Sequence, residues 1–156
     1  MTSADTHVFR ATSVYDPDWS AGGHQCYGFD QWMQFYDHFR VLSSTITVCV
    51  SNTLTSVPIT FGIGLHSDTG ISYADLELNR ERDRTGFTVV GPRDGGANTR
   101  RIRKTYSLRK FFTKQTPLDD DIFRGSASAN PVENAYFYVF AQAFDNVRIV
   151  TGKQLP

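Results

Sequence analysis

A sharp change of hydrophobic period, between residues 29–39 and residues 44–50, most constrains how this chain can fold. In the first segment, aromatic and apolar side chains recur every three or four residues, which predicts a helix of about three turns. In the second segment the period is two, and Ile46, Val48 and Val50 share one face, which predicts a half-buried strand. The sequence therefore predicts a short helix joined directly to a strand of a sheet.

The predicted helix needs burial, because a helix this short is marginal in water without packing. We expect its core-facing side chains to be Phe29, Trp32, Met33, Tyr36 and Phe39. Gly28 is expected to end the preceding loop, and Asp30 to cap the helix. A sugar-stacking platform is the alternative role for these aromatics, and packing is the preferred interpretation.

Other segments predict a mainly antiparallel β-protein. Further strands are expected at residues 7–15, 57–65, 85–91, 135–144 and 147–151, and one or two strands over 101–112. Loops are expected at 16–28, 91–100 and 113–134, and a short helix or loop at 72–84. The segment 135–144 is apolar on both faces, which places it centrally in a sheet, and Gly62 and Gly64 indicate a bulge or a close backbone approach. About seven or eight short strands and one helix favour an all-β sandwich or jelly roll.

Composition predicts one domain and excludes some function classes. We expect residues 1–7 to be a loose end and residues 8–156 to form a single domain. The 16 basic and 16 acidic residues balance, which argues against a generally basic nucleic-acid binder. The sequence contains neither a long apolar run nor a basic leader, so no membrane span or secretory signal is expected. Cys26 and Cys49 match no metal spacing and are expected to be reduced, with a disulfide left open.

The sequence offers weak candidates for metal binding or catalysis. Asp16, Asp18 and His24 lie in one loop, and residues 119–121 are three consecutive aspartates. Asp-rich loops are more often turns or solvated segments than metal sites, so we prefer that interpretation to a metal or calcium site. The chain has no G-x-S-x-G elbow, Gly-rich phosphate loop or H-E-x-x-H helix, so neither an enzyme nor a cofactor is expected.

The segment 98–114 concentrates positive charge without any acidic residue. Its cations are Arg100, Arg101, Arg103, Lys104, Arg109, Lys110 and Lys114. They alternate with the aromatics Tyr106, Phe111 and Phe112, a combination that can track phosphates and stack bases of a single strand. The equally acceptable alternative is charge complementarity with the acidic segments 75–83 or 118–121, in the same or a neighbouring copy.

The segment that contains the predicted helix and strand resembles a known protein family. "YDPDWSAGGHQCYGFDQWMQFYDHFRVLSSTITVCV" resembles the front of the capsid proteins of small circular Rep-encoding single-stranded DNA viruses, circovirus-like or crucivirus-like. In that family a YDPD turn, a Gly-rich loop ending in YGFDQW, a helix and an alternating strand follow in this order. "RKTYSLRKFF" and "ANPVENAYFYVFAQAF" are similar to later family segments, so the resemblance covers about residues 8 to 145.

The resemblance implies an eight-stranded antiparallel jelly roll with one short helix between its first strands. It further implies a non-enzymatic capsid protein that self-assembles into an icosahedral shell on the order of 60 copies around viral nucleic acid, with single-stranded DNA as the expected form. The expected location is the virion, with assembly in the host nucleus or cytoplasm. The resemblance does not indicate a host receptor, and no membrane is expected to be involved.

The chain departs from the family pattern at both ends. The family's basic N-terminal arm and its last strand have no counterpart here, which suggests a shortened or divergent relative. A sheet short of an edge strand offers a pairing template to a neighbour. Two other classes stay open: a carbohydrate-binding β-sandwich using Trp19, Trp32 or Tyr27, and a single-strand nucleic-acid binder using residues 98–114.

Overall fold

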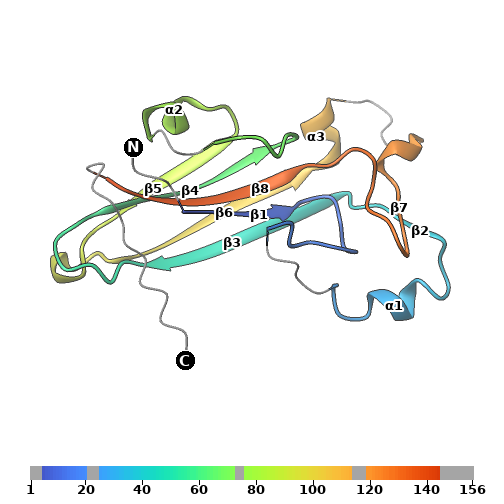
Figure 1. Cartoon of the computed structure of the whole chain (residues 1–156), viewed down its shortest axis with the longest axis horizontal. Coiled ribbons are helices and arrows are strands. Elements are labelled where there is room, and N and C mark those ends of the chain that lie inside the picture. Colours follow the sequence, from blue (N-terminus) through green and yellow to red (C-terminus); the bar gives the residue numbers. More distant parts are fainter. Residues whose placement is uncertain (1–4, 21–24, 73–75, 114–118, 145–156) are drawn as a thin grey trace.

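The structure is a computed structural model and describes residues 5–20, 25–72, 76–113 and 119–144. Its strands are β1 (Asp5–Arg10), β2 (His38–Phe39), β3 (Ser43–Ser51), β4 (Ile59–His66), β5 (Thr85–Val90), β6 (Thr99–Ser107), β7 (Gly125–Ser126) and β8 (Tyr136–Ala143). Its helices are α1 (Phe29–Trp32), α2 (Leu76–Glu81), α3 (Leu108–Phe112) and the 3₁₀ turns η1 (Arg93–Gly95) and η2 (Asp121–Phe123). The described chain is therefore mostly β-structure, as predicted, but it has several short helices where the predicted fold class had one (Figure 1).

All strand pairs in the described residues are antiparallel and form three sheets. The largest has the order β1-β8-β4-β5, and the other two pair β3 with β6 and β2 with β7. The long β3–β6 ribbon runs along the four-stranded sheet, and β6 contacts both β4 and β5 (Figure 1). The described strands reach the predicted number of eight only when the two-residue strands β2 and β7 are counted.

The strand pairs are nested along the chain. β1 pairs with β8, β2 with β7, β3 with β6 and β4 with β5. The chain thus forms one long antiparallel ribbon that doubles back between β4 and β5. A further pairing, between β4 and β8, joins two parts of this ribbon into the four-stranded sheet.

The main core lies between the β3–β6 ribbon and the four-stranded sheet. Ile63 and Leu65 of β4, Tyr106 of β6 and Phe137 of β8 are all buried in one cluster. Ile46 of β3 is half-buried and packs against them. The alternating pattern of β3 is what turns its apolar side chains toward this core, so the strand predicted most clearly from sequence is confirmed.

β8 lies between β1 and β4, as predicted from its apolar character on both faces. Phe137 points into the main core, while Tyr138 and Phe140 form a second cluster with Val8 on the other face of the sheet. The Tyr138 hydroxyl donates a hydrogen bond to the backbone oxygen of Asp68 at 2.7 Å. The loop after β4 therefore covers the outer face, which explains why both faces of β8 are apolar.

The prediction of a helix over residues 29–39 is wrong in length. α1 ends at Trp32, and one further turn, closed by the amide of Phe35 bonding to the Trp32 oxygen, leads toward β2. Gly28, at φ 80°, is the N-cap, so Asp30 lies in the first turn and is not the cap. Gly28, in the left-handed backbone conformation, begins the helix. Few intrahelical backbone hydrogen bonds follow it, so the helix stays short.

The predicted burial of that helix face is also largely wrong. Phe29 is buried against the Phe39 ring, with centroids 5.5 Å apart, and Met33 and Phe39 are half-buried. Trp32 and Tyr36 are instead 66% and 59% exposed. A helix face is buried only where another element lies against it, and the short α1 turns only its first aromatic toward the body of the protein.

Several predicted boundaries also shift. β1 begins at Asp5, so residues 5–7 are strand and not a loose end, and it ends at Arg10 because Ala11 bonds instead to the Ala135 oxygen at 2.7 Å. The expected strand over 101–112 changes to α3 at Leu108, whose amide bonds to the Leu42 oxygen. The expected strand at 147–151 lies outside the described residues.

Candidate functional site

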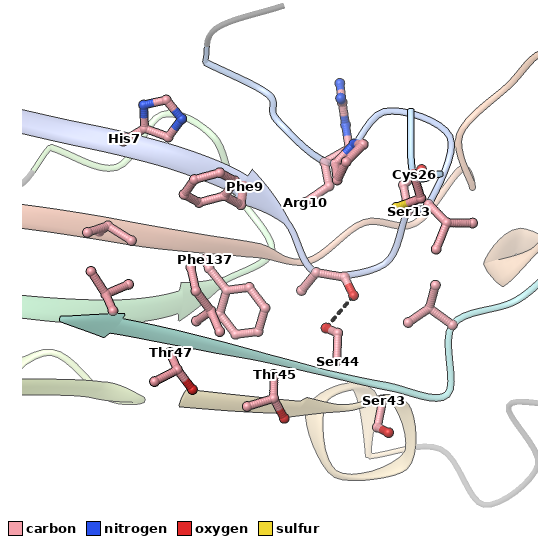
Figure 2. A pocket seen from close by; sticks show the side chains of 17 residues that line it. His7, Phe9, Arg10, Ser13, Cys26, Ser43, Ser44, Thr45, Thr47 and Phe137 are labelled. Carbon is pink, nitrogen blue, oxygen red and sulfur yellow. Dashed lines mark hydrogen bonds between the residues drawn. The ribbon is translucent and has the colours of Figure 1, made fainter. Parts of the chain in front are cut away.

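An apolar groove opens between the two layers, on the side where β1 and β3 face each other. Its volume is about 690 Å³, within the range of ordinary binding sites. Phe137 and Val139 of β8 line it from one layer, and Ile46 and Val48 of β3 from the other. Figure 2 shows Phe137 beside β3 in this groove. The groove is therefore an uncovered part of the core and not a separate cleft.

One wall of the groove is the edge of β3 and not one of its faces. Every residue from Ser43 to Val48 lines the groove, so side chains from both faces of the strand border it. Near one end, the Ser44 hydroxyl donates to the backbone oxygen of Ala11 at 2.6 Å and fixes the distance between the layers (Figure 2). The rest of β3 runs along the opening with its edge toward the groove.

The opposite wall is β1, whose outer edge is covered by a loop. The Arg10 amide bonds to the Pro17 oxygen at 2.8 Å, and the Trp19 amide bonds to the Val8 oxygen at 3.1 Å. The amide of Val8 donates to the Ser20 hydroxyl at 2.8 Å. Edge strands covered in this way are protected from pairing with other chains.

The acidic residues of this loop hold it in place. Asp18 accepts a hydrogen bond from the His7 ring at 2.8 Å and another from the Ser20 amide at 3.2 Å. Asp16 forms an ion pair with Arg10. These contacts favour the predicted turn over a metal site, and His24 lies outside the described residues.

The exposed aromatics form a second, adjoining groove of about 350 Å³. Its lining includes Tyr27, Trp32 and Tyr36, which are 97%, 66% and 59% exposed. Val14 and Cys26 line both grooves, so the two surfaces are continuous. We call the exposed side chains Tyr27, Trp32, Phe35 and Tyr36 the aromatic patch.

The structure divides the basic segment 98–114 among different surfaces. Arg101 and Arg103 are exposed on the outer face of the β3–β6 ribbon, whereas Lys104 is half-buried on the inner face. Burial and the charge of Arg84 lower the pKa of Lys104, while Asp83 acts in the opposite direction. Arg100 is exposed near the start of β6, Arg109 and Lys110 are exposed on α3, and Lys114 lies outside the described residues.

The expectation that aromatics of this segment stack on bases is wrong for two of them. Tyr106 and Phe111 are 0% and 7% exposed and belong to the main core. Burial raises the pKa of the Tyr106 hydroxyl. Phe112 is half-buried against Phe123, with ring centroids 4.8 Å apart. The outer ribbon face thus combines arginines with hydroxyl groups: Thr45 and Thr105 lie opposite each other with their oxygens 3.0 Å apart.

The remaining candidates gain no support as metal or catalytic sites. No group of three metal-ligating side chains occurs among residues 5–20, 25–72, 76–113 and 119–144. Asp120 accepts a hydrogen bond from the Ile122 amide at 3.2 Å, and Asp121 pairs with Arg124 at 2.8 Å, as in an ordinary capped turn. Cys26 and Cys49 are free, as predicted, and both are exposed.

Sequence reasoning missed a charged niche beside β4. His66, Arg82, Asp83 and Arg84 line a cavity of about 310 Å³. Burial, followed by the charges of Arg82 and Arg84, lowers the pKa of His66. These residues are far from His66 in sequence, and no local pattern predicted that the loop after α2 would bring them together.

The comparisons with known proteins give no identification. No family model, curated protein or solved structure matches this chain. Within the described residues, no helix has the length and apolar character needed to cross a membrane.

Proposed function

We propose that this chain is the subunit of a self-assembling protein shell and that its fold is a jelly roll. The nested order of the strand pairs supports the proposal most strongly. β1–β8, β2–β7, β3–β6 and β4–β5 form one continuous antiparallel ribbon, and β4–β8 pairing rolls it into layers. Rolled antiparallel ribbons of this kind build viral capsid and lectin domains.

Fold alone does not specify function, so surface features must support the shell proposal. The aromatic patch adjoins an open apolar groove, and contiguous exposed apolar surface of this kind commonly marks protein–protein contacts. Aromatic side chains are enriched in the buried centres of such contacts. The balanced charge of the chain also avoids long-range repulsion between copies.

The proposed cargo is nucleic acid, with single-stranded DNA as the expected form and the virion as the location. Arg101 and Arg103 are exposed on the outer face of β6, opposite Cys49 and Thr47 of β3, and provide a surface suited to phosphate contacts. The acidic residues of the described chain lie outside this face, because every outward residue of β3 and β6 is Ser, Thr, Cys or Arg.

The shell proposal is tested by particle formation. The purified full chain should assemble into uniform closed particles, visible by negative-stain electron microscopy, as protein concentration rises. Trp32→Ala and Tyr36→Ala should prevent assembly while the protein remains folded, because both side chains are exposed in the single chain. A chain that stays monomeric across a wide range of salt and pH would contradict the proposal.

A second candidate function, carbohydrate binding, is favoured by one specific observation. Tyr27, Trp32 and Tyr36 are exposed and line a single groove, as a sugar-stacking site requires. Trp19, the third aromatic proposed for this role, is 43% exposed but packs near Tyr136, away from that groove. A glycan array screened with the wild-type chain and Trp32→Ala separates the functions: selective glycan binding by monomers would favour the second.

A further inference from the structure

We propose that the free edge of β3 pairs antiparallel with β3 of a second copy of this chain. The two ribbons would then form one four-stranded sheet in the order β6-β3-β3-β6 across a two-fold axis. This inference rests on the proposed self-association and names one of its contacts. It concerns the backbone edge of β3, which borders the apolar groove and which the shell proposal above does not assign to any contact.

β3 is the long edge strand that lacks protection. Within the described ranges it pairs with β6 on one side and with no strand on the other. Its sequence, SSTITVCVS, contains no charged residue and no proline. Its register with β6 is unbroken from Ser43 to Ser51, so no bulge turns the edge away. Charges, prolines, bulges and covering loops are the usual means by which proteins keep edge strands from pairing.

The other edge strands each have one of these protections. The outer edge of β1 is hydrogen-bonded to the loop at residues 17–20. β5 is contacted by α2, which lies beside it (Figure 1). β6 carries exposed Arg101 and Arg103 and half-buried Lys104. The absence of protection is therefore particular to β3 among the long strands described, which indicates that this edge is used for pairing.

The alternating pattern of β3 fits a second β3 as its partner. In a two-fold antiparallel pair, Ile46, Val48 and Val50 of both copies lie on the same inner face, and the Ser, Thr and Cys side chains lie on the outer face. Neither β3 strand carries a charged side chain, so pairing the two strands causes no electrostatic repulsion between them. Such a contact is self-complementary, as a closed two-fold interface requires, and the backbone groups supply the hydrogen bonds.

The groove beside β3 gives this pairing an apolar side. Phe9, Phe137 and Val139 line the opening next to the β3 edge. Inner side chains of the second β3 would lie at this opening and cover apolar surface that the single chain leaves open. The surface area buried by strand pairing alone is smaller than that of a stable interface, which buries about 1,200–2,000 Å². The aromatic patch, continuous with the groove through Val14 and Cys26, is placed to extend the contact.

A charge-swap experiment tests the pairing. Thr47 is near the middle of β3, exposed, and opposite Arg103 on β6. Thr47→Lys places like charges from two copies near each other, so this variant alone should associate roughly tenfold more weakly than wild type. In Thr47→Glu the cross-strand Arg103 offsets part of the added charge, so its association should weaken by a smaller factor. An equimolar mixture should recover wild-type association, because opposite charges then meet. Sedimentation of the full-length chains measures all three.

The matched control is Thr105→Glu together with Thr105→Lys. Thr105 is exposed on the same outer face but on β6, away from the proposed pairing edge. Both control variants should associate as wild type does. In parallel, amide hydrogen exchange should slow in residues 44–50 as wild-type concentration rises, and should remain fast in the Thr47 variants.

The outcomes separate this inference from the shell proposal. Particles that form equally well with Thr47→Glu and Thr47→Lys would overturn β3 pairing and leave the shell function standing. A wild-type chain that never associates would overturn both. Slow exchange of residues 44–50 in a monomer, abolished by ending the chain after Phe144, would show that residues 145–156 cover the edge. That result too would overturn pairing with a second copy.

Discussion

Gly62 of β4 lies directly opposite Phe140 of β8, and the Phe140 ring fills the space that a side chain at position 62 would need. A Cβ on Gly62 would stand 2.7 Å from Cε1 of Phe140 and 2.9 Å from the Gly86 backbone oxygen. The register of β4 with β8 is unbroken from Ile59 to His66. Of the two alternatives predicted for this glycine, a bulge or a close approach, the close approach is confirmed.

Gly62→Ala should lower the free energy of unfolding by about 1–3 kcal/mol, the usual effect of overpacking a core. Urea denaturation followed by tryptophan fluorescence measures it. Gly86→Ala on the neighbouring strand is the matched control, because its added Cβ meets only Ile102 Cδ1 at 3.9 Å. That variant should keep wild-type stability or gain up to about 1 kcal/mol. Equal losses in both variants would contradict the assigned contact.

Trp32→Ala should change the free energy of unfolding by no more than about 0.5 kcal/mol, because Trp32 is 66% exposed. Phe29→Ala, only three positions earlier, should cost about 3–5 kcal/mol, since that ring is 6% exposed and buried against Phe39. Chemical denaturation of the two variants side by side makes the comparison. A large loss of unfolding free energy in Trp32→Ala would contradict the exposed position of Trp32 and would support the predicted burial of the aromatic helix face.

The free energy of unfolding should fall as the pH is lowered from about 7.5 to about 5.5, near the usual histidine pKa. The folded state lowers the pKa of His66 through burial and the charges of Arg82 and Arg84. The unfolded chain therefore binds the proton more readily, so acid favours unfolding and the stability is present at higher pH. His66→Gln should flatten this part of the thermal stability profile, whereas His38→Gln, at an exposed site, should not.

Arg101→Gln should weaken binding to a single-stranded oligonucleotide and reduce the slope of log affinity against log salt by about 0.7. The physical reason is the loss of one exposed phosphate contact on the outer face of β6. Lys110→Gln removes the same charge from α3 and should leave the slope unchanged. Titrations at several salt concentrations measure both. Equal effects of the two substitutions would show that charge alone, and not the ribbon face, governs binding.

Strand identity was largely predictable because it is encoded locally. The alternation over residues 44–50 and the apolar segment 135–144 predicted β3 and the central position of β8, and both are confirmed. The segments 57–65 and 85–91 likewise contain β4 and β5. Each of these patterns repeats with the period of the backbone itself, so neighbouring residues carry the information without help from distant ones.

Burial of individual side chains could not be predicted in the same way. Trp32 was expected in the core but is exposed. Lys104 was expected to face a ligand but is half-buried. Whether a side chain is covered depends on which element lies against it, and that element can be distant in sequence. Lys104, for example, lies close enough to Asp83 and Arg84 for their charges to shift its pKa.

The sequence by itself determined that this chain is built mainly from antiparallel strands, and where most of the long strands run. Only the tertiary structure decided that β3 forms an open edge, that β1 is covered, and that the aromatics around Trp32 lie on the surface. The physical reason is that hydrophobic period is a property of a segment. Edge exposure and burial are properties of its neighbours, and the order of strand pairing brings those neighbours together from far along the chain.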